Sequence, residues 1–598
     1  MRDGGNKLTE NFQENKKMFW KEVKRVRKGR DKMEGRVKAE DGTVLTEKQA
    51  VEKRWAKCFE RLLNKEEGRE AIITAVAREN PVRVMGELNE SPITKKEIEA
   101  AVKKLKAGKA AGLDGAEVEC IKSGGKSVVE WLVRLLNVCF QEGKVPEDWM
   151  SACIVPLYKG KGDKLCCGSY RGISLLSVVG KLYGRVLDGR VRRGTEGEIR
   201  EEQGGFLSGR GCVDQIFAVR QICEKYMAKG KEVFWAFMDL EKAYDFIERI
   251  PLWDILRMYG IGGKLLGGVK SFYENSKACV RVGDGVSEWF PVKVGLRQGC
   301  VMSPWLFNLY MDGVVREVNM RVMERGLSLL ESENGECKLN QLLFADDTAL
   351  VADSEEELQH LVREFGRVCK RRKLKVNVNK SKVMRCRRGV DDSRLNVTLE
   401  GEQLEEVDCF KYLGSSISVD GKIEGEVKAR VNEVAKVQGG LKEILKSKTL
   451  KMDAKRRLYE GIAVPTALYG AETWNMSVKD RRRLNVVEMR CLRNMCGVTR
   501  RDRIRNEEIR RRTGVMRDLA GRADQSTLRW FGHIERMEED RLVKRIYRSE
   551  ARGVAPRGRP QLRWMDGVKR ALNDRGVSVD QARVKVRDRN EWRAIVSV

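Results

Sequence analysis

The sequence predicts an α+β fold built from several packed units, with helical segments towards both ends. Its 598 residues exceed the length of about 100–200 residues that one domain usually occupies. Apolar residues make up 41% of the chain and charged residues 34%, a balance that supports packed cores and excludes disorder throughout. Strand-like, helix-like and glycine-rich segments alternate up to about residue 420, and helical patterns dominate from there to about residue 500.

Residues 1–85 are predicted to form a helical arm or linker, in which no group points to chemistry. A turn signal at Asp41-Gly42 separates two helical stretches. Each stretch carries an apolar stripe at helical spacing: Phe19, Trp20, Val23 and Val26, then Val51, Trp55, Phe59 and Leu62.

Acidic residues end two apolar strand patterns in the middle of the chain. Residues 233–238 form an apolar run that ends at Asp239, and two further apolar runs flank Asp346-Asp347 as in a hairpin with an acidic tip. Adjacent carboxylates repel one another unless a cation holds them. If the three acids converge, they form the oxygen-rich kind of site that suits Mg²⁺, and polymerases use two such ions about 4 Å apart.

A helix is predicted directly after the acidic hairpin. Ser354 followed by Glu357 fits a capping box, and an apolar stripe runs from Leu358 to Val368. The basic residues 370–373 follow, and they complement the negative end of the helix dipole.

Two further elements accompany the acids. Gln298-Gly299 lies in a glycine-rich turn ahead of an apolar helix, where the backbone can approach a nucleotide or template base closely. Tyr244 follows Asp239 by five residues, and two interpretations stay open from the residues alone: a ring under the sugar of an incoming nucleotide, or an ordinary core tyrosine.

These motifs resemble palm motifs A, B and C of a reverse transcriptase of the non-LTR (LINE-type) retrotransposons. Supporting motifs precede and follow them in the family's order between about residues 90 and 500. The motifs are 109–115, 149–159, 169–176, 203–214, Phe237–Asp245, Gln298-Gly299 with Ser303-Pro304, Phe344–Asp347, 374–382 and Phe410–Gly414.

The resemblance implies a right-hand polymerase fold and RNA-directed DNA polymerase activity. It implies fingers and palm over residues 86–405, a primer grip and helical thumb over 406–500, and a basic nucleic-acid-binding module over 501–598. The expected partners are an RNA template, a DNA primer or target DNA, and dNTPs. The expected cofactors are two Mg²⁺ ions, with Mn²⁺ as the alternative, and the expected location is the nucleus and cytoplasm.

Site residues carry over from the resemblance position by position. Asp239, Asp346 and Asp347 would be the catalytic metal ligands, and Tyr244 would be the sugar gate. Gln298 and Gly299 would contact the template and the nucleotide, and Lys159 and Arg171 would contact the triphosphate or the template. Lys380 would be either the proton donor to pyrophosphate or a plain surface lysine. The primer grip would contain Tyr412, Leu413 and Gly414.

Two departures from the family pattern stand out. Gly172 replaces the proline of the family's Tyr-Arg-Pro-Ile-Ser motif, which loosens a turn without removing a functional group. About 90 residues precede the polymerase motifs, too few for the endonuclease that such elements usually carry there, so the chain is expected to lack it.

Charge is concentrated at the end of the chain. The whole chain has a formal charge of +30, and residues 481–598 contribute 32 basic and 16 acidic side chains, which favours a polyanionic partner. Arg557, Arg559, Arg563 and Trp564 are predicted to grip phosphates and stack on bases. The Arg-Gly-Arg-Pro string at 557–560 resembles an AT-hook core, and a basic turn without groove preference is the alternative.

Several classes of protein are excluded or kept as rivals. No run of about 18 apolar residues exists to span a membrane. Without a signal-like N-terminus, the 16 scattered cysteines indicate reduced thiols in an intracellular protein. Cys491, Cys496 and His533 lack zinc-site spacing, so no zinc is predicted. The rivals are a repurposed, catalytically inactive RNA- or DNA-binding protein, an RNA-dependent RNA polymerase and a group II intron maturase.

Overall fold

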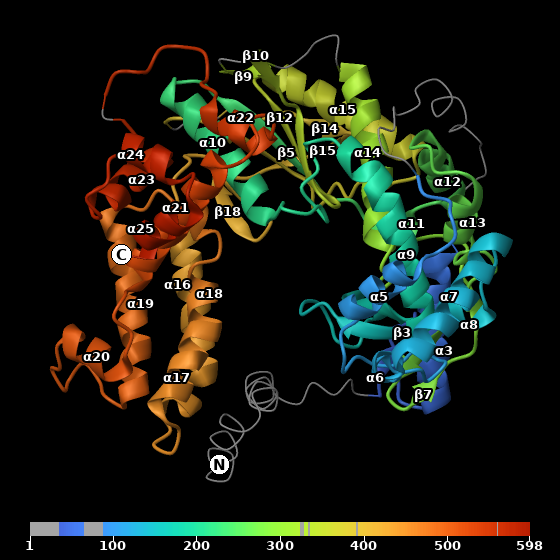
Figure 1. Cartoon of the computed structure of the whole chain (residues 1–598). Coiled ribbons are helices and arrows are strands. Elements are labelled where there is room, and N and C mark those ends of the chain that lie inside the picture. The colour runs from blue at the N-terminus through green and yellow to red at the C-terminus, as the bar shows by residue number, and fades with distance from the viewer. Residues whose placement is uncertain are drawn as a thin grey trace.

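The computed structural model describes residues 35–64, 88–322, 328–332, 335–389, 393–558 and 560–597. We call residues 35–176 with 277–291 the fingers lobe, 177–276 with 292–405 the palm, 406–500 the thumb and 501–598 the C-terminal module. The fingers lobe and the thumb lie on opposite sides below the palm, and the C-terminal module packs beside the palm and thumb (Figure 1). None of the helices in the described ranges is long and apolar enough to cross a bilayer.

The fingers lobe is built on a sheet with the order β4-β3-β6-β7, with β8 also paired to β6. Strand β3 runs antiparallel to β4 and parallel to β6, which joins segments more than 100 residues apart in the sequence. Helices α5 to α8 lie ahead of this sheet along the chain. The bounds are α5 Lys95–Lys104, α6 Val118–Ser123, α7 Gly125–Glu142, α8 Glu147–Met150, β3 Ser151–Tyr158, β4 Tyr170–Leu175, β6 Lys277–Val282, β7 Gly285–Val286 and β8 Phe290–Pro291.

Helix α3 (Lys48–Leu63) belongs to the fingers core and is not a separate arm. It follows a short hairpin, β1 Val37–Lys38 and β2 Val44–Leu45, whose turn at Asp41-Gly42 was predicted. The predicted stripe Val51, Trp55 and Phe59 is buried against β3, β4 and β6. The earlier stripe, Phe19 to Val26, lies outside the described residues.

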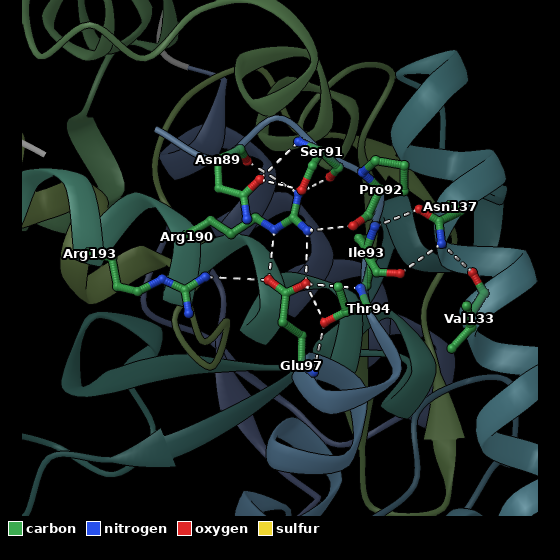
Figure 2. A network of polar contacts seen from close by, with 10 residues as sticks. All are labelled: Asn89, Ser91, Pro92, Ile93, Thr94, Glu97, Val133, Asn137, Arg190 and Arg193. Carbon is green, nitrogen blue, oxygen red and sulfur yellow. Dashed lines mark hydrogen bonds and ion pairs between the residues drawn. The ribbon is translucent and has the colours of Figure 1, made fainter. Parts of the chain in front are cut away.

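A buried arginine ties the entry segment of the fingers lobe to helix α9 (Val178–Thr195). Figure 2 shows the Arg190 guanidinium reaching the carbonyls of Asn89, Ser91 and Pro92 and the carboxylate of Glu97. Burial alone would raise the pKa of Glu97, but its bonds to Arg190 and Thr94 hold that pKa at about 2. All five guanidinium protons can be used in this way, which keeps a fully buried charge satisfied.

The palm contains a second sheet, with the order β11-β12-β5-β13-β16. Strand β5 lies at its centre and is completely buried, in accord with the apolar run seen in the sequence. The bounds are β5 Val233–Met238, β11 Gln341–Phe344, β12 Asp347–Ala352, β13 Lys382–Cys386, β16 Glu405–Glu406, α10 Cys212–Ala228, α11 Ala243–Phe246, α12 Arg249–Met258, α13 Gly263–Ser271, α14 Ser303–Val322 and α15 Glu355–Arg371.

The helix predicted after the acidic hairpin is α15. The Ser354 hydroxyl accepts the N–H of Glu357, so the Ser354 half of the predicted capping box forms. The apolar stripe from Leu358 to Val368 is buried as expected.

The thumb begins with the hairpin β17 (Cys409–Tyr412) and β18 (Ser415–Ser418) and continues as helices. The regular elements of the C-terminal module are helices over its described residues, and α21 to α25 contribute side chains to apolar cores that include residues of α10 in the palm. The bounds are α16 Glu424–Lys446, α17 Met452–Leu458, α18 Val464–Ala467, α19 Val478–Cys496, α20 Asn506–Thr513, α21 Leu519–Glu535, α22 Leu542–Arg548, α23 Trp564–Asn573, α24 Val579–Lys585 and α25 Arg589–Ser597.

Candidate active site

The three predicted acids come together at one end of the palm sheet. Strand β12 pairs antiparallel with β5, with Thr348 opposite Met238, and the same register continues to place Asp347 beside Asp239. Asp346 lies at the tip of the β11–β12 hairpin, next to Ala345, whose φ of 60° is uncommon for a residue with a side chain. Strand pairing therefore brings together acids that are more than 100 residues apart in the sequence.

The pKa values of Asp346 and Asp347 reflect the proximity of these carboxylates. Burial raises the pKa of Asp347 to about 6, with further contributions from the charges of Asp346 and Asp239. Burial also raises the pKa of Asp346, to which the charge of Asp239 adds. Carboxyl groups whose neighbouring charges disfavour the ionisation of Asp346 and Asp347 form a site that a cation would stabilise.

The donor chemistry of the acids fits Mg²⁺. All the available ligand atoms are carboxylate oxygens, which this ion prefers. Within the described ranges, no three acidic, histidine or cysteine side chains are already grouped closely enough to hold an ion. Lys380 supplies the local cation instead, with its Nζ 3.1 Å from Asp239 Oδ2. Binding of a metal to Asp239 therefore requires this lysine to share or release the carboxylate.

Tyr244 lies beside the acids on α11. Its ring stacks on Phe307 with 4.3 Å between centroids and meets Phe206 edge-on at 6.4 Å. Burial, with the charge of Asp346, raises the pKa of its phenol, and the hydroxyl has no hydrogen-bond partner among the described residues. A ring fixed on two sides is suited to a steric role, as predicted for a sugar gate.

The predicted Gln298-Gly299 turn joins the palm to the fingers lobe. The Ser174 N–H donates to the Gln298 carbonyl at 2.8 Å, and the Leu296 N–H donates to the Tyr244 carbonyl at 2.8 Å. Gly299 has a φ of 120°, and a Cβ there would lie 2.7 Å from the Ser174 carbonyl oxygen. Glycine is therefore required at Gly299 for this close approach.

Basic side chains from several elements surround the acids. The Lys159 Nζ donates to the Gly168 carbonyl at 2.8 Å. Burial lowers the pKa of Lys159, and the nearby charges of Lys242, Arg171 and Lys380 lower it further. Arg171 is exposed on β4 and interacts with Asp346 through its charge. The two predicted fingers residues thus belong to a basic cluster beside the acidic tip.

The predicted primer grip is a tight two-residue hairpin. Leu413 and Gly414 form its turn with φ values of 46° and 84°, and the Tyr469 hydroxyl donates to the Leu413 carbonyl at 2.7 Å. Tyr412 is only 2% exposed, and its ring lies 5.6 Å from that of Phe237. The two turn residues are half-buried, and Tyr412 supports the hairpin from inside.

The prediction for Trp564 as a base-stacking residue is wrong. Its side chain is 1% exposed, packs edge-on against Phe217 at 4.9 Å and donates through Nε1 to the Glu472 carbonyl. Trp530 is buried in the same core. Arg557 and Arg563 are exposed, so they remain candidates for phosphate contacts, and Arg559 lies outside the described residues.

Sequence reasoning assigned no role to two polar residues that help to build the site. Asp245 accepts a hydrogen bond from Gln298 Nε2 at 3.2 Å, and burial raises its pKa to about 6. Gln203 is fully buried and its Oε1 accepts the N–H of Ala345 at 2.9 Å. Both lie inside quoted motifs, and only the structure shows which side chain each one contacts.

Comparisons with known proteins agree with this geometry. The family model described as "Reverse transcriptase (RNA-dependent DNA polymerase)" matches residues 159–417. Among curated relatives, the "Putative 115 kDa protein in type-1 retrotransposable element R1DM" of Drosophila melanogaster is 27% identical over 63% of this chain and 36% of its own length. The "Probable RNA-directed DNA polymerase from transposon BS" of the same species is 25% identical over 67% of this chain and 44% of its own.

The "RNA-directed DNA polymerase from mobile element jockey" of Drosophila melanogaster is 23% identical over 68% of this chain and 44% of its own length. The chain thus spans less than half of the length of these relatives. The family match covers the strands that carry Asp239, Asp346 and Asp347, together with the fingers residues and the hairpin at Leu413-Gly414. Residues 159–417 therefore form a reverse transcriptase domain of the kind found in non-LTR retrotransposons.

Proposed function

We propose that the chain is an RNA-directed DNA polymerase of a non-LTR retroelement, which extends a primer 3′-hydroxyl on an RNA template. The observation that carries this proposal is the register of β5 and β12, which gathers three carboxylates at one end of the palm sheet. Their like charges are balanced in the structure only by basic side chains such as Lys380. An arrangement of this kind is suited to a substrate that brings its own divalent cations, as nucleoside triphosphates do.

The proposed mechanism assigns a task to each group. Asp239, Asp346 and Asp347 would bind two Mg²⁺ ions, which stabilise the attacking and leaving oxygens in nucleotidyl transfer. Lys380, whose Nζ lies 3.1 Å from Asp239 Oδ2, would donate a proton to the pyrophosphate leaving group. Tyr244 would exclude a 2′-hydroxyl with its fixed ring.

The surroundings of the site support a nucleic-acid substrate. The cluster of Lys159, Arg171, Lys242 and Lys380 is suited to triphosphate and template phosphates. The β17–β18 hairpin would contact the primer strand through its turn at Leu413-Gly414. We accordingly propose an RNA template and a DNA primer or target as partners, and a location in the nucleus and cytoplasm where such elements copy RNA.

Primer extension tests the proposal directly. Full-length protein, an RNA template annealed to a DNA primer, dNTPs and Mg²⁺ should give extended DNA. Asp346→Asn should reduce kcat about 1,000-fold or more, because a misplaced metal ion costs several kcal/mol of transition-state stabilisation. Template-primer affinity should stay within about twofold, because Asp346 is an anion and makes no attractive contact with phosphate.

The rival function is a catalytically inactive RNA- or DNA-binding protein that keeps this fold. Wild-type protein that binds template-primer tightly, extends nothing and behaves like Asp346→Asn would establish the rival and exclude the polymerase. Glu241→Gln is a matched control, since this neighbouring acid pairs with Lys375 at 3.3 Å and is predicted to have no part in metal binding. Its extension rate should equal that of the wild type.

A further inference from the structure

The acid-bearing hairpin is held by a neighbouring segment, residues 199–211, through Gln203. The Gln203 Oε1 accepts the N–H of Ala345 at 2.9 Å and the N–H of Gly205 at 2.8 Å. The Gly204 N–H donates to the Leu343 carbonyl at 2.7 Å. A Cβ at Gly205 would lie 2.5 Å from the nitrogen of Ala345, so the two backbones are in direct contact. The uncommon φ of Ala345, and with it the place of Asp346, is therefore fixed by this segment.

Arg210 connects two residues within the same segment, Glu201 and Gln203. Its guanidinium donates to the Gln203 carbonyl at 2.8 Å and to the Glu201 carbonyl at 3.2 Å, and it also pairs with the Glu201 carboxylate. The Arg210 side chain is 12% exposed and that of Glu201 is 35% exposed, and the hydrogen bonds between them are charge-assisted. The position of Gln203 is thus coupled to that of Glu201.

The C-terminal module contacts this segment at Glu201. The Leu542 N–H, at the start of α22, donates to Glu201 Oε2 at 3.2 Å. The Arg541 guanidinium lies 3.3 Å from Glu201 Oε2 and 3.6 Å from Asp214 Oδ1, and it is 20% exposed. Asp214 is buried, and it caps the start of α10 by accepting the Gly211 N–H. Arg541 therefore bridges both ends of the bend that leads from Glu201 to α10.

Helix α22 is itself fixed on the palm. It lies against α10 in Figure 1, and Leu542 and Ile546 are buried in one core with Ile222 of α10. The Lys225 Nζ donates to the carbonyls of Ile546 and Tyr547, where a cation also complements the end of the helix dipole. The contact at Arg541 is thus made by a rigidly docked helix and not by a loose tail.

We propose that the C-terminal module positions the acid-bearing hairpin of the palm, with Arg541 as the positioning residue that acts through Glu201, Arg210 and Gln203. This inference rests on the proposed polymerase function. It assigns the module a part in nucleotide transfer that is separate from any grip on nucleic acid. The module then belongs to the catalytic unit, because Arg541, directly before its helix α22, contacts the segment that holds the hairpin.

The test compares Arg541→Gln with wild type in the full-length protein. Removal of the charge should lower kcat about 10-fold, the lower end of the loss seen when a residue that supports metal ligands is removed, because Arg541 acts through several intervening contacts. The Kd for primed RNA template should stay within about twofold. Arg541→Lys should recover part of kcat, because it restores the charge. Hydrogen exchange in metal-free protein should accelerate over residues 202–206 and 341–348.

The matched control is Arg548→Ala, which removes an exposed ion pair with Glu539 from the same helix. Its kcat and its exchange over residues 341–348 should equal those of wild type. A double variant, Arg541→Gln with Glu201→Gln, should lose no more than the worse single variant if the two residues act in one chain of contacts.

Two results overturn the inference while leaving the polymerase intact. One is a wild-type kcat and exchange pattern in Arg541→Gln. The other is a loss of activity that parallels a fall in template-primer affinity or in the folded fraction. Failure of the proposed function reads differently, since wild-type protein itself would then extend no primer.

Discussion

The palm and the C-terminal module use charged side chains in opposite ways. In the palm, the charges of Asp239, Asp346 and Asp347 act on one another, and burial raises the pKa of Asp346 and Asp347. In the helices that pack around α21, arginines are matched to acids and carbonyls. Arg481 lies 2.6 Å from Asp524 and Arg570 lies 3.2 Å from the same carboxylate. The carboxylates of the palm therefore form a site suited to a cationic ligand, whereas the paired arginines hold helices together.

Because many arginines are paired, the net positive charge of the C-terminal module overstates how many side chains can bind a polyanion. Arg510 pairs with the fully buried Glu488 at 2.7 Å, and Arg536 donates to the Val586 carbonyl at 2.9 Å. Arginines of this kind hold helices together and are less available to phosphate. The basic residues of the module that can meet a polyanion are the exposed ones, such as Arg557 and Arg563.

The largest effect on stability is expected in the core that joins the C-terminal module to the palm. Trp564→Ala should destabilise the protein by about 3–5 kcal/mol, because it empties a core shared with Phe217 of the palm. Lys569→Ala, on the exposed face of the same helix α23, should change stability by less than about 0.5 kcal/mol. Urea unfolding measures both variants. A small loss for Trp564→Ala would mean that the module docks only weakly on α10.

Tyr244→Val tests whether the Tyr244 ring excludes ribonucleotides from the palm. Loss of the ring that stacks on Phe307 should raise ribonucleotide incorporation relative to deoxyribonucleotide incorporation by about 10- to 100-fold. The ratio of kcat/KM for the two substrates on one template gives the result. Equal discrimination in wild type and variant would remove Tyr244 from the gate, and a wild type without preference would favour an RNA polymerase.

Glu224 offers a pH-dependent test of the docking between palm and module. It accepts the N–H of Trp564 at 2.7 Å, and burial raises its pKa to about 7, against the opposing charges of Lys225 and Arg563. A folded-state pKa above the unfolded value gives stability that is full below about pH 4.5 and lost as the pH rises through 7.

Glu224→Gln removes this titration. The free energy of unfolding of the variant, measured relative to wild type, should therefore increase by about 1–2 kcal/mol between pH 5 and pH 8. Urea titrations of both proteins at the two pH values give this difference. If it is the same at both, the proton on Glu224 is not linked to folding.

The smallest effect is expected at an exposed arginine of the module. Arg557→Ala should weaken binding to primed template slightly and reduce the slope of log K against log salt by about 1, as for one lost phosphate contact. Binding titrations at several salt concentrations supply the slope. An unchanged slope would place Arg557 outside the interface. Deletion of residues 501–598 is a poorer test, because it would expose the palm core that α22 and α23 cover.

Local patterns in the sequence were sufficient to predict the acid-bearing hairpin, strand β5 and helix α15. Each is defined by short-range periodicity and by an end signal such as Ser354. Local patterns could not predict which part of the protein an apolar stripe packs against. Trp55 and Phe59 repeat at helical spacing whether they form an arm or enter the fingers core, and Trp564 looks like a base-stacking residue beside its arginines. The contact of Gln203 with Ala345 spans 142 positions and has no local signature.

The central place of β5 in the palm sheet has a consequence for how the protein is made. Both of its neighbours, β12 and β13, follow it by more than 100 residues, so the ribosome releases Val233–Met238 well before either exists. At about 5–20 residues per second, this apolar strand waits several seconds with both edges unpaired. Abundant chaperones during synthesis should therefore raise the soluble yield, because aggregation competes most strongly in that interval.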